Sequence, residues 1–289
     1  MSDYVIMTDN TVDMPLAWLK EHQVDYLCLS CNMDGEIYDK EHVIEDKEFY
    51  RRMRAGSMPT TSQVNPTAAE EIFESVLKEG KDVLYLAFSS GLSGTYNSCR
   101  VAAEELRDSY PDRKLEVIDT LAASMGEGLL VWYAVKMKEE GKSMEEVAQW
   151  VKENILHTGH VFTVDDLNHL YRGGRVSKAT AVLGTLANIK PMLHVDNEGK
   201  LIPVGKVRGR KKSLATLVSM MEERMGTYRD KNEIVLISHG DCEEDAAYVA
   251  KLVEEKFGIT NVMMNPIGAT IGAHAGPGTV ALFFLGEYR

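Results

Sequence analysis

The sequence predicts an α/β protein with two domains: an N-terminal domain built on a parallel sheet and a C-terminal mixed α+β domain. The chain of 289 residues is longer than one average domain, and its hydrophobic content of 44% suffices for packed cores. In the first half, a strand, a polar loop and a helix follow one another three times. Such alternation indicates a parallel sheet with both faces covered. In the second half, a strand–turn–strand segment interrupts the alternation.

The three repeated units define the N-terminal half. Short apolar runs at residues 4–8, 83–88 and 115–118 predict strands, and each is followed by a polar loop. Helical segments then begin near Pro15, after Thr95 (through residue 106) and after Thr120 (toward residue 138). Ligands of parallel sheets bind at loops that follow the carboxyl ends of strands, so we expect a site there.

The C-terminal half changes character after a helical pattern at residues 143–154. Residues 160–164 predict a strand, and residues 191–195 and 200–204 predict a hairpin around the turn at residues 197–199. A helix from about Ser213, a strand at 233–238, a helix at 242–256 and a strand at 261–265 follow. We therefore place a domain boundary near residue 157, giving domains 1–157 and 158–289.

Charge and patterning exclude several classes of protein. The formal net charge of −12 argues against non-specific binding to nucleic acid or anionic membranes. We find no signal peptide and no apolar run long enough for membrane insertion, so we expect a cytoplasmic protein. Residues 206–212 are basic at five of seven positions, which indicates either a solvated face or a docking patch for an acidic or phosphate-bearing partner.

The four cysteines include a C-x-x-C pair, Cys28 and Cys31. We interpret residues 26–31 as one strand, on which these two side chains point to opposite faces. There is no second C-x-x-C in the sequence to complete a zinc site. We expect structural cysteines and no metal site.

Four segments rich in small residues carry the candidate chemistry. Residues 59–66 contain the consecutive hydroxyls of Thr60, Thr61 and Ser62 before a helix that Asn65 caps. Residues 89–96 form a glycine-rich strand-to-helix loop, which suits either an anion or a tight turn. Residues 170–175 contain two arginines around a glycine pair, and residues 268–278 form a loop of glycine and alanine around one histidine.

Ser93 and His274 also suggest a second hypothesis, a serine acyl hydrolase whose catalytic triad includes an acid such as Asp165. The G-x-S-x-G elbow is incomplete, because Thr95 stands at its last position. A sugar-phosphate or nucleotide-phosphate binder would use the same loops, although the sequence contains no nucleotide-binding motif.

With these segments assembled, the chain resembles the DegV family of bacterial fatty-acid-binding proteins. The similarity rests on motifs in the expected order along the whole chain, which are IMTD at 6–9, TTSQ at 60–63, SGLSGTY at 90–96, DT at 119–120, LYRGGR at 170–175, NIKP at 188–191, GKVRG at 205–209 and HAGPG at 274–278.

The resemblance implies a fatty acid such as palmitate, stearate or oleate buried between the two domains, and no cofactor. It implies that Thr61, Ser62, Ser93 and His274 hold the carboxylate, with Gly94 allowing close approach of the backbone. It further implies a carrier and not an enzyme, which presents the fatty acid to a separate ATP-dependent fatty acid kinase. In that picture Arg172 and Arg175 lie near the head group and the surface that contacts the kinase.

Overall fold

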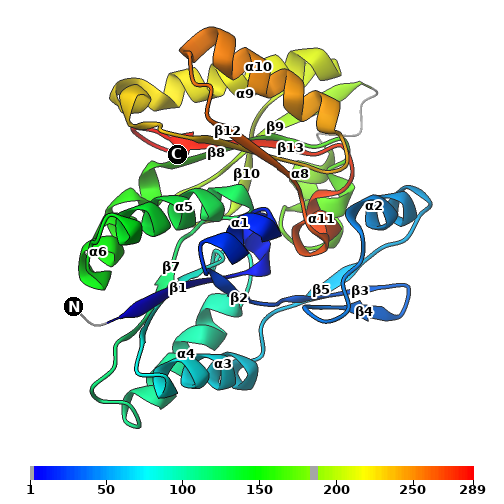
Figure 1. Ribbon diagram of the computed structural model, residues 1–289. Coiled ribbons are helices and arrows are strands. Elements are labelled where there is room, and N and C mark those ends of the chain that lie inside the picture. Colours follow the sequence, from blue (N-terminus) through cyan, green and yellow to red (C-terminus); the bar gives the residue numbers. More distant parts are fainter. Residues whose placement is uncertain (1–2, 183–187) are drawn as a thin grey trace.

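A computed structural model describes residues 3–182 and 188–289 and contains two large sheets and one small sheet (Figure 1). The first large sheet is entirely parallel, in the order β2-β1-β6-β7. Its strands are β1 (Tyr4–Asp9), β2 (Asp25–Leu27), β6 (Asp82–Ala87) and β7 (Leu115–Asp119). The parallel sheet predicted for the first half is therefore confirmed.

The second large sheet is mixed, in the order β10-β9-β8-β13-β11-β12, and all its neighbours are antiparallel except β11 and β12. Its strands are β8 (Thr158–Thr163), β9 (Ile189–Val195), β10 (Leu201–Arg208), β11 (Val235–His239), β12 (Val262–Pro266) and β13 (Val280–Leu285). The predicted hairpin is confirmed as β9 and β10. The sequence interpretation missed β13, although this strand pairs with both β8 and β11 near the middle of the sheet.

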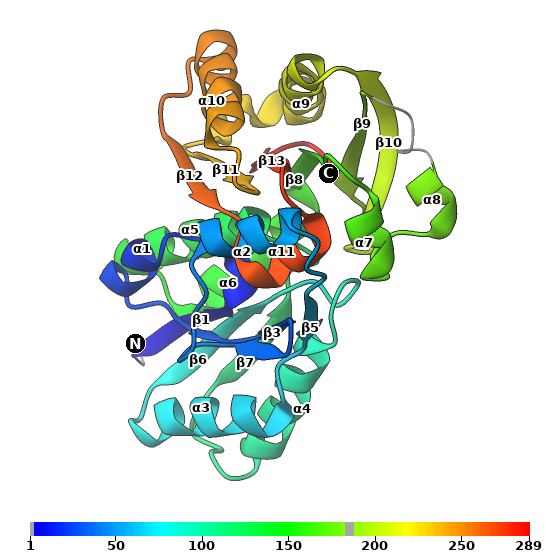
Figure 2. The same ribbon diagram turned by 90° about the vertical axis from the view of Figure 1, so that its right-hand side faces the viewer.

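Helices cover both sheets in layers (Figures 1 and 2). Helices α3 (Pro66–Lys78) and α4 (Thr95–Arg107) cover the outer face of the parallel sheet, and α9 (Arg210–Met225) and α10 (Glu243–Phe257) cover the outer face of the mixed sheet. Helices α1 (Leu16–Glu21), α5 (Met125–Glu139) and α6 (Met144–Asn154) lie between the sheets and share one apolar core with both. The domain boundary near residue 157 stays a prediction, because this shared core joins the two halves.

Local signals explain where several helices begin. The Asn65 side chain accepts a hydrogen bond of 3.0 Å from the Thr67 N–H, and Pro66 occupies the first turn of α3, as predicted. At α6, Ser143 and Glu146 form a capping box, in which each side chain accepts from the other residue's backbone N–H.

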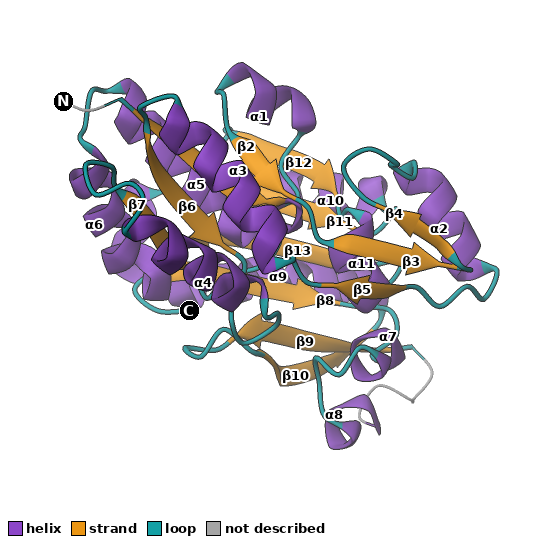
Figure 3. Cartoon of the chain, turned by 90° about the horizontal axis from the view of Figure 1, so that it is seen from below, coloured by secondary structure: helices purple, strands orange, loops and turns teal. Residues whose placement is uncertain are grey.

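A small antiparallel sheet projects from the first half, in the order β4-β3-β5 (Figure 3). Its strands are β3 (Ser30–Met33), β4 (Glu36–Tyr38) and β5 (Thr60–Ser62), and α2 (Asp46–Arg54) packs beside it. The interpretation of residues 26–31 as one strand is wrong, because β2 ends at Leu27 and β3 starts at Ser30 in a different sheet. The Asn10 side chain holds the break by bonding both the N–H and the C=O of Leu29, at 2.9 and 3.0 Å.

The glycine-rich segment at 268–278 also differs from the expectation of a loop, because it begins with helix α11 (Ala269–Ala275). This helix contacts β3, β5 and α2 of the first half and α7 (Asn168–Arg172) of the second half. A β-carbon at Gly272 would lie 2.6 Å from Tyr50 Oη and 2.8 Å from Phe49 Cε1, so glycine permits this close packing. The short helix α8 (Lys178–Val182) follows α7.

Candidate functional site

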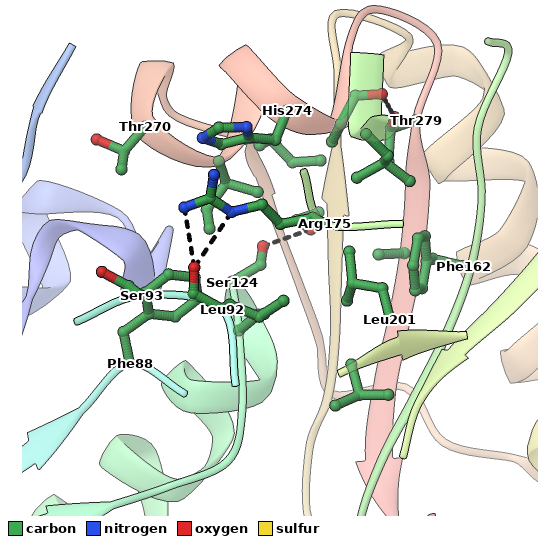
Figure 4. A pocket seen from close by; sticks show the side chains of 18 of the residues that line it. Phe88, Leu92, Ser93, Ser124, Phe162, Arg175, Leu201, Thr270, His274 and Thr279 are labelled. Atoms are coloured by element: carbon green, nitrogen blue, oxygen red, sulfur yellow. Dashed lines mark hydrogen bonds between the residues drawn. The ribbon is translucent and has the colours of Figure 1, made fainter. Parts of the chain in front are cut away.

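A cavity of about 210 Å³ lies where loops of the first half meet the mixed sheet and α11 (Figure 4). Most of its wall is apolar, formed by Leu29, Phe88, Leu92, Ala123, Phe162, Leu170, Val195, Leu201, Ile267, Ile271, Ala275, Ala281 and Phe283. We call it the inner cavity. Its polar lining residues are Thr61, Gln63, Ser93, Ser124, His160, Arg175, Ser238, Thr270, His274 and Thr279.

A second cavity of about 290 Å³, the outer cavity, adjoins the inner one. Its lining is more polar and includes His169 and Arg172, together with the exposed side chain of Met58. Thr61, Arg175 and His274 line both cavities. These three side chains therefore mark the boundary between an apolar chamber and a polar one.

At this boundary, Thr61 Oγ1 lies 2.7 Å from His274 Nε2. Thr61 comes from β5 and His274 from the last turn of α11, so two halves of the chain meet in this hydrogen bond. Burial, and secondarily the charge of Arg175, lower the pKa of His274 to about 4. The imidazole is thus neutral at pH 7. Its buried Nδ1 has no hydrogen-bond partner among the described residues.

Ser93 enters the inner cavity from the loop between β6 and α4. Its Oγ lies 3.0 Å from Thr95 Oγ1 and accepts a hydrogen bond of 3.2 Å from the Thr95 N–H. The next residue is Gly94, where a β-carbon would lie 2.1 Å from Gln63 Oε1. Glycine at this position therefore lets Gln63 pack against the backbone of the loop.

The two predicted arginines have different environments. Arg175 is half-buried and donates from Nε and Nη2 to the carbonyl of Leu92, at 3.1 and 2.9 Å, and from Nη1 to the carbonyl of Gly173 (Figure 4). Burial lowers the pKa of Arg175. Arg172 is exposed at the outer cavity, where its Nη2 lies 2.8 Å from His169 Nδ1. Of these two arginines, Arg175 lines both cavities and Arg172 lines the outer one.

The structure therefore brings together Thr61, Ser93, Gly94, Arg175 and His274 at the inner cavity. Ser62 is exposed on β5 and lines neither cavity. Sequence reasoning missed Gln63, whose Nε2 donates to Ser98 Oγ at 3.0 Å. Strand β5 ends at Ser62, so alternation along the strand does not place Gln63, and no sequence signal singles it out.

The geometry gives no support to a serine hydrolase. Ser93 Oγ bonds to Thr95, whereas His274 bonds to Thr61. Asp165 bonds to Lys190 Nζ at 2.6 Å and not to the histidine. Among the described residues, His274 Nδ1 also lacks the carboxylate partner that a catalytic triad requires.

Two further findings concern residues 3–182 and 188–289. None of their helices is both long and apolar enough to cross a bilayer. Within the same ranges, no three His, Cys, Asp or Glu side chains gather closely enough to hold a metal ion.

Together, these features define a mixed α/β protein with an apolar chamber whose polar end opens into an outer cavity. A family model described as an uncharacterised protein of the DegV family matches residues 3–287, and the chain belongs to this family. The resemblance and the fold class predicted from sequence are thereby confirmed.

Relatives and solved structures cover the whole chain. It is 45% identical over 291 residues to a DegV domain-containing protein of Clostridium perfringens, covering 100% of this chain and 99% of the relative. A DegV family protein from Thermus thermophilus, described by its fatty acid binding, has a TM-score of 0.87 at 30% identity and covers 99% and 100% of the two chains. A stearic acid-binding protein from Eubacterium ventriosum has a TM-score of 0.87 at 25% identity, with 99% of each chain covered.

Proposed function

We propose that this protein binds a long-chain fatty acid, with the tail in the inner cavity and the carboxylate at the boundary with the outer cavity. The observation that carries the proposal is the change from an apolar to a polar chamber at Thr61, Arg175 and His274. The fatty acid binding described for the solved relatives from Thermus thermophilus and Eubacterium ventriosum supports it.

The energetics favour an amphiphile of this kind. Each buried methylene contributes about 0.8 kcal/mol, so a tail of sixteen carbons has roughly 10 kcal/mol available before the costs of ordering. The inner cavity of about 210 Å³ is smaller than typical ligand pockets of roughly 300 to 1,000 Å³, so we expect lining side chains to shift around a long tail.

The carboxylate requires hydrogen-bond donors, because an unpaired buried charge is costly. We assign this role to the hydroxyl of Ser93 and to the Thr61–His274 pair. Because the imidazole is neutral and the two side chains share one hydrogen bond, one of their two protons remains for the carboxylate. Ser62 has no part in this assignment because of its exposed position. Gly94 supports the site by leaving room for Gln63 beside the loop of Ser93.

We further propose that a separate ATP-dependent fatty acid kinase phosphorylates the bound carboxylate, so the protein acts as a carrier. The outer cavity supports this role, since it adjoins the boundary residues and contains the exposed guanidinium of Arg172. We assign the docking patch for this partner to the exposed Lys206, Arg208, Lys211 and Lys212, whereas Arg210 pairs with Asp245 at 2.8 Å. A cytoplasmic location stays a prediction.

Native mass spectrometry of the purified protein, before and after solvent extraction, tests the binding proposal. We expect one fatty acid per chain, and a delipidated protein that takes up one equivalent on titration. Thr61→Ala removes one hydrogen bond to a charged group, which corresponds to a loss of affinity of roughly tenfold or more.

Ser62→Ala is the matched control, because it deletes a neighbouring hydroxyl that lines neither cavity. We expect its affinity to equal that of the wild type. A protein that neither carries nor takes up fatty acid would reject the function. Equal losses in the two variants would reject the placement of the carboxylate.

A further inference from the structure

Two buried serines interrupt the apolar wall of the inner cavity. Ser124 precedes α5, and Ser238 lies on β11; their Oγ atoms are 2.9 Å apart. Ser124 Oγ is also 2.5 Å from Asp13 Oδ2, and Asp13 Oδ1 accepts a hydrogen bond of 2.9 Å from the Gly268 N–H. Both serines line the cavity, and Ser238 has no exposed surface. A tail made only of methylenes offers no partner for such hydroxyls.

The backbone at Ser124 is also unusual. Its φ of 54° and ψ of −144° lie in a region that residues with a side chain rarely adopt. Ser124 adopts this conformation in the wall of the inner cavity, where its side chain bridges Asp13 and Ser238. Strained backbone of this kind gathers at ligand-binding sites, so the bridge is a candidate site and not only a turn.

Asp13, Ser124 and Ser238 form a row of hydrogen-bonded side chains, and the Ser238 hydroxyl at its end can form one more hydrogen bond. If Asp13 is ionised, Ser124 donates to Asp13 and Ser238 donates to Ser124, so Ser238 Oγ still has lone pairs to accept a donor. If Asp13 is protonated, the direction of the row reverses and the proton of Ser238 has no acceptor. Among the described residues, the Ser238 hydroxyl has Ser124 as its hydrogen-bond partner and no other. A ligand hydroxyl both donates and accepts, so it fits either state.

We propose that the Ser124–Ser238 pair is a subsite for an oxygen substituent on the acyl chain, and that the protein binds fatty acids hydroxylated at mid-chain. The inference rests on the proposed function and adds to it the chemical class of the preferred ligand.

The structure also indicates where along the tail the oxygen lies. Gly268, which contacts Asp13, stands before the first turn of α11, whereas His274 stands near its end. The six steps between them span about 9 Å at a rise of about 1.5 Å per residue. An extended chain advances roughly 1.2 Å per bond, so this distance corresponds to about seven or eight bonds and places the subsite near carbons 8 to 9. The hydroxyl is expected at mid-chain and not beside the carboxylate or at the methyl end.

The test compares binding of delipidated protein to octadecanoic acid and to octadecanoic acids hydroxylated at mid-chain, beside the carboxylate or at the terminal carbon. We expect a mid-chain isomer to bind about threefold to tenfold more tightly than octadecanoic acid, the range expected for one neutral hydrogen bond. Ser238→Ala removes the hydroxyl that would bond the ligand, and we expect this variant to bind octadecanoic acid more tightly than the mid-chain hydroxy acid. Ser75→Ala, on the exposed face of α3, is the control and is expected to keep the wild-type order of the two acids.

Ser124→Gly is the second variant, because glycine tolerates the backbone angles and also removes the bridge; it is expected to abolish the preference. An unchanged ratio in both variants, or octadecanoic acid binding as well as every mid-chain isomer to the wild type, would overturn the inference. In those cases octadecanoic acid still binds, so the proposed function survives. Failure to bind any of the acids would instead reject the proposed function itself.

Discussion

The contact between Gly173 and His274 gives a direct test of the carboxylate site. Gly173 ends α7 with φ of −71° and ψ of −9°, angles that alanine adopts readily. A β-carbon there would lie 2.0 Å from Nδ1 and 2.9 Å from Cε1 of His274. These distances are far below van der Waals contact, so Gly173→Ala forces the imidazole to move.

Movement of the ring breaks the 2.7 Å hydrogen bond between Thr61 and His274 and misplaces the donor for the carboxylate. One hydrogen bond to a charged group is worth about 1.5 to 3 kcal/mol, so we expect the affinity for fatty acid to fall roughly 10- to 150-fold. Overpacking against the ring and loss of its hydrogen bond should also lower the free energy of unfolding, by about 1 to 3 kcal/mol.

Fluorescence or calorimetric titration of delipidated protein measures this loss, and thermal unfolding checks the fold. Gly205→Ala is the matched control, since a β-carbon at Gly205 would meet no atom within 4 Å. If Gly173→Ala keeps its full affinity while Gly205→Ala behaves as the wild type, His274 does not hold the carboxylate.

Three further outcomes are expected. Arg172→Ala should leave fatty acid affinity nearly unchanged but lower the rate of phosphorylation by the kinase; equal losses of both would contradict the division of roles. Arg289→Ala should lower the free energy of unfolding by about 3 kcal/mol in urea titration, because the buried guanidinium donates to backbone carbonyls of both halves, those of Thr120, Leu121, Ile155 and Asp196. Asp13→Asn should remove a pH dependence of the free energy of unfolding. Burial raises the pKa of Asp13 to about 8, so the stability that this carboxyl contributes is complete below pH ~4. It is lost as pH rises toward 8, by about 1.4 kcal/mol per pH unit. A wild type and a variant with parallel stability profiles between these pH values would contradict the assignment.

Much of the fold follows from local sequence signals. Apolar runs before polar loops predicted β1, β6 and β7 because a buried parallel strand needs apolar residues on both faces. Helix α11 was missed because the glycines at 268, 272, 276 and 278 indicate a loop, whereas Ala269, Ala273 and Ala275 favour the helix that forms. It forms because Gly272 allows α11 to approach Phe49 and Tyr50, which are more than 200 residues away in the sequence. The break between β2 and β3 likewise depends on the side chain of Asn10.

Part of the candidate site could be predicted from the sequence. Thr61, Ser93 and His274 stand in segments whose composition already suggested a ligand, and the resemblance assigned them together. Their meeting at one boundary depends on tertiary packing, since Thr61 and His274 are 213 residues apart. Ser124 and Ser238 carried no sequence signal, because isolated serines are ordinary in loops and strands. Their relation to the cavity exists only in the folded chain.

The role of Arg175 shows why hydroxyls rather than a cation are suited to this site. A free arginine at the boundary would hold a carboxylate by a forked ion pair. Here the Nε, Nη1 and Nη2 atoms of Arg175 all donate to backbone carbonyls of Leu92 and Gly173, so the side chain chiefly joins two loops. In the proposed function the carboxylate therefore meets neutral donors, while the nearby positive charge lowers the cost of its burial. A carboxylate held this way keeps lone pairs available to attack a phosphate, as the proposed presentation to a kinase requires.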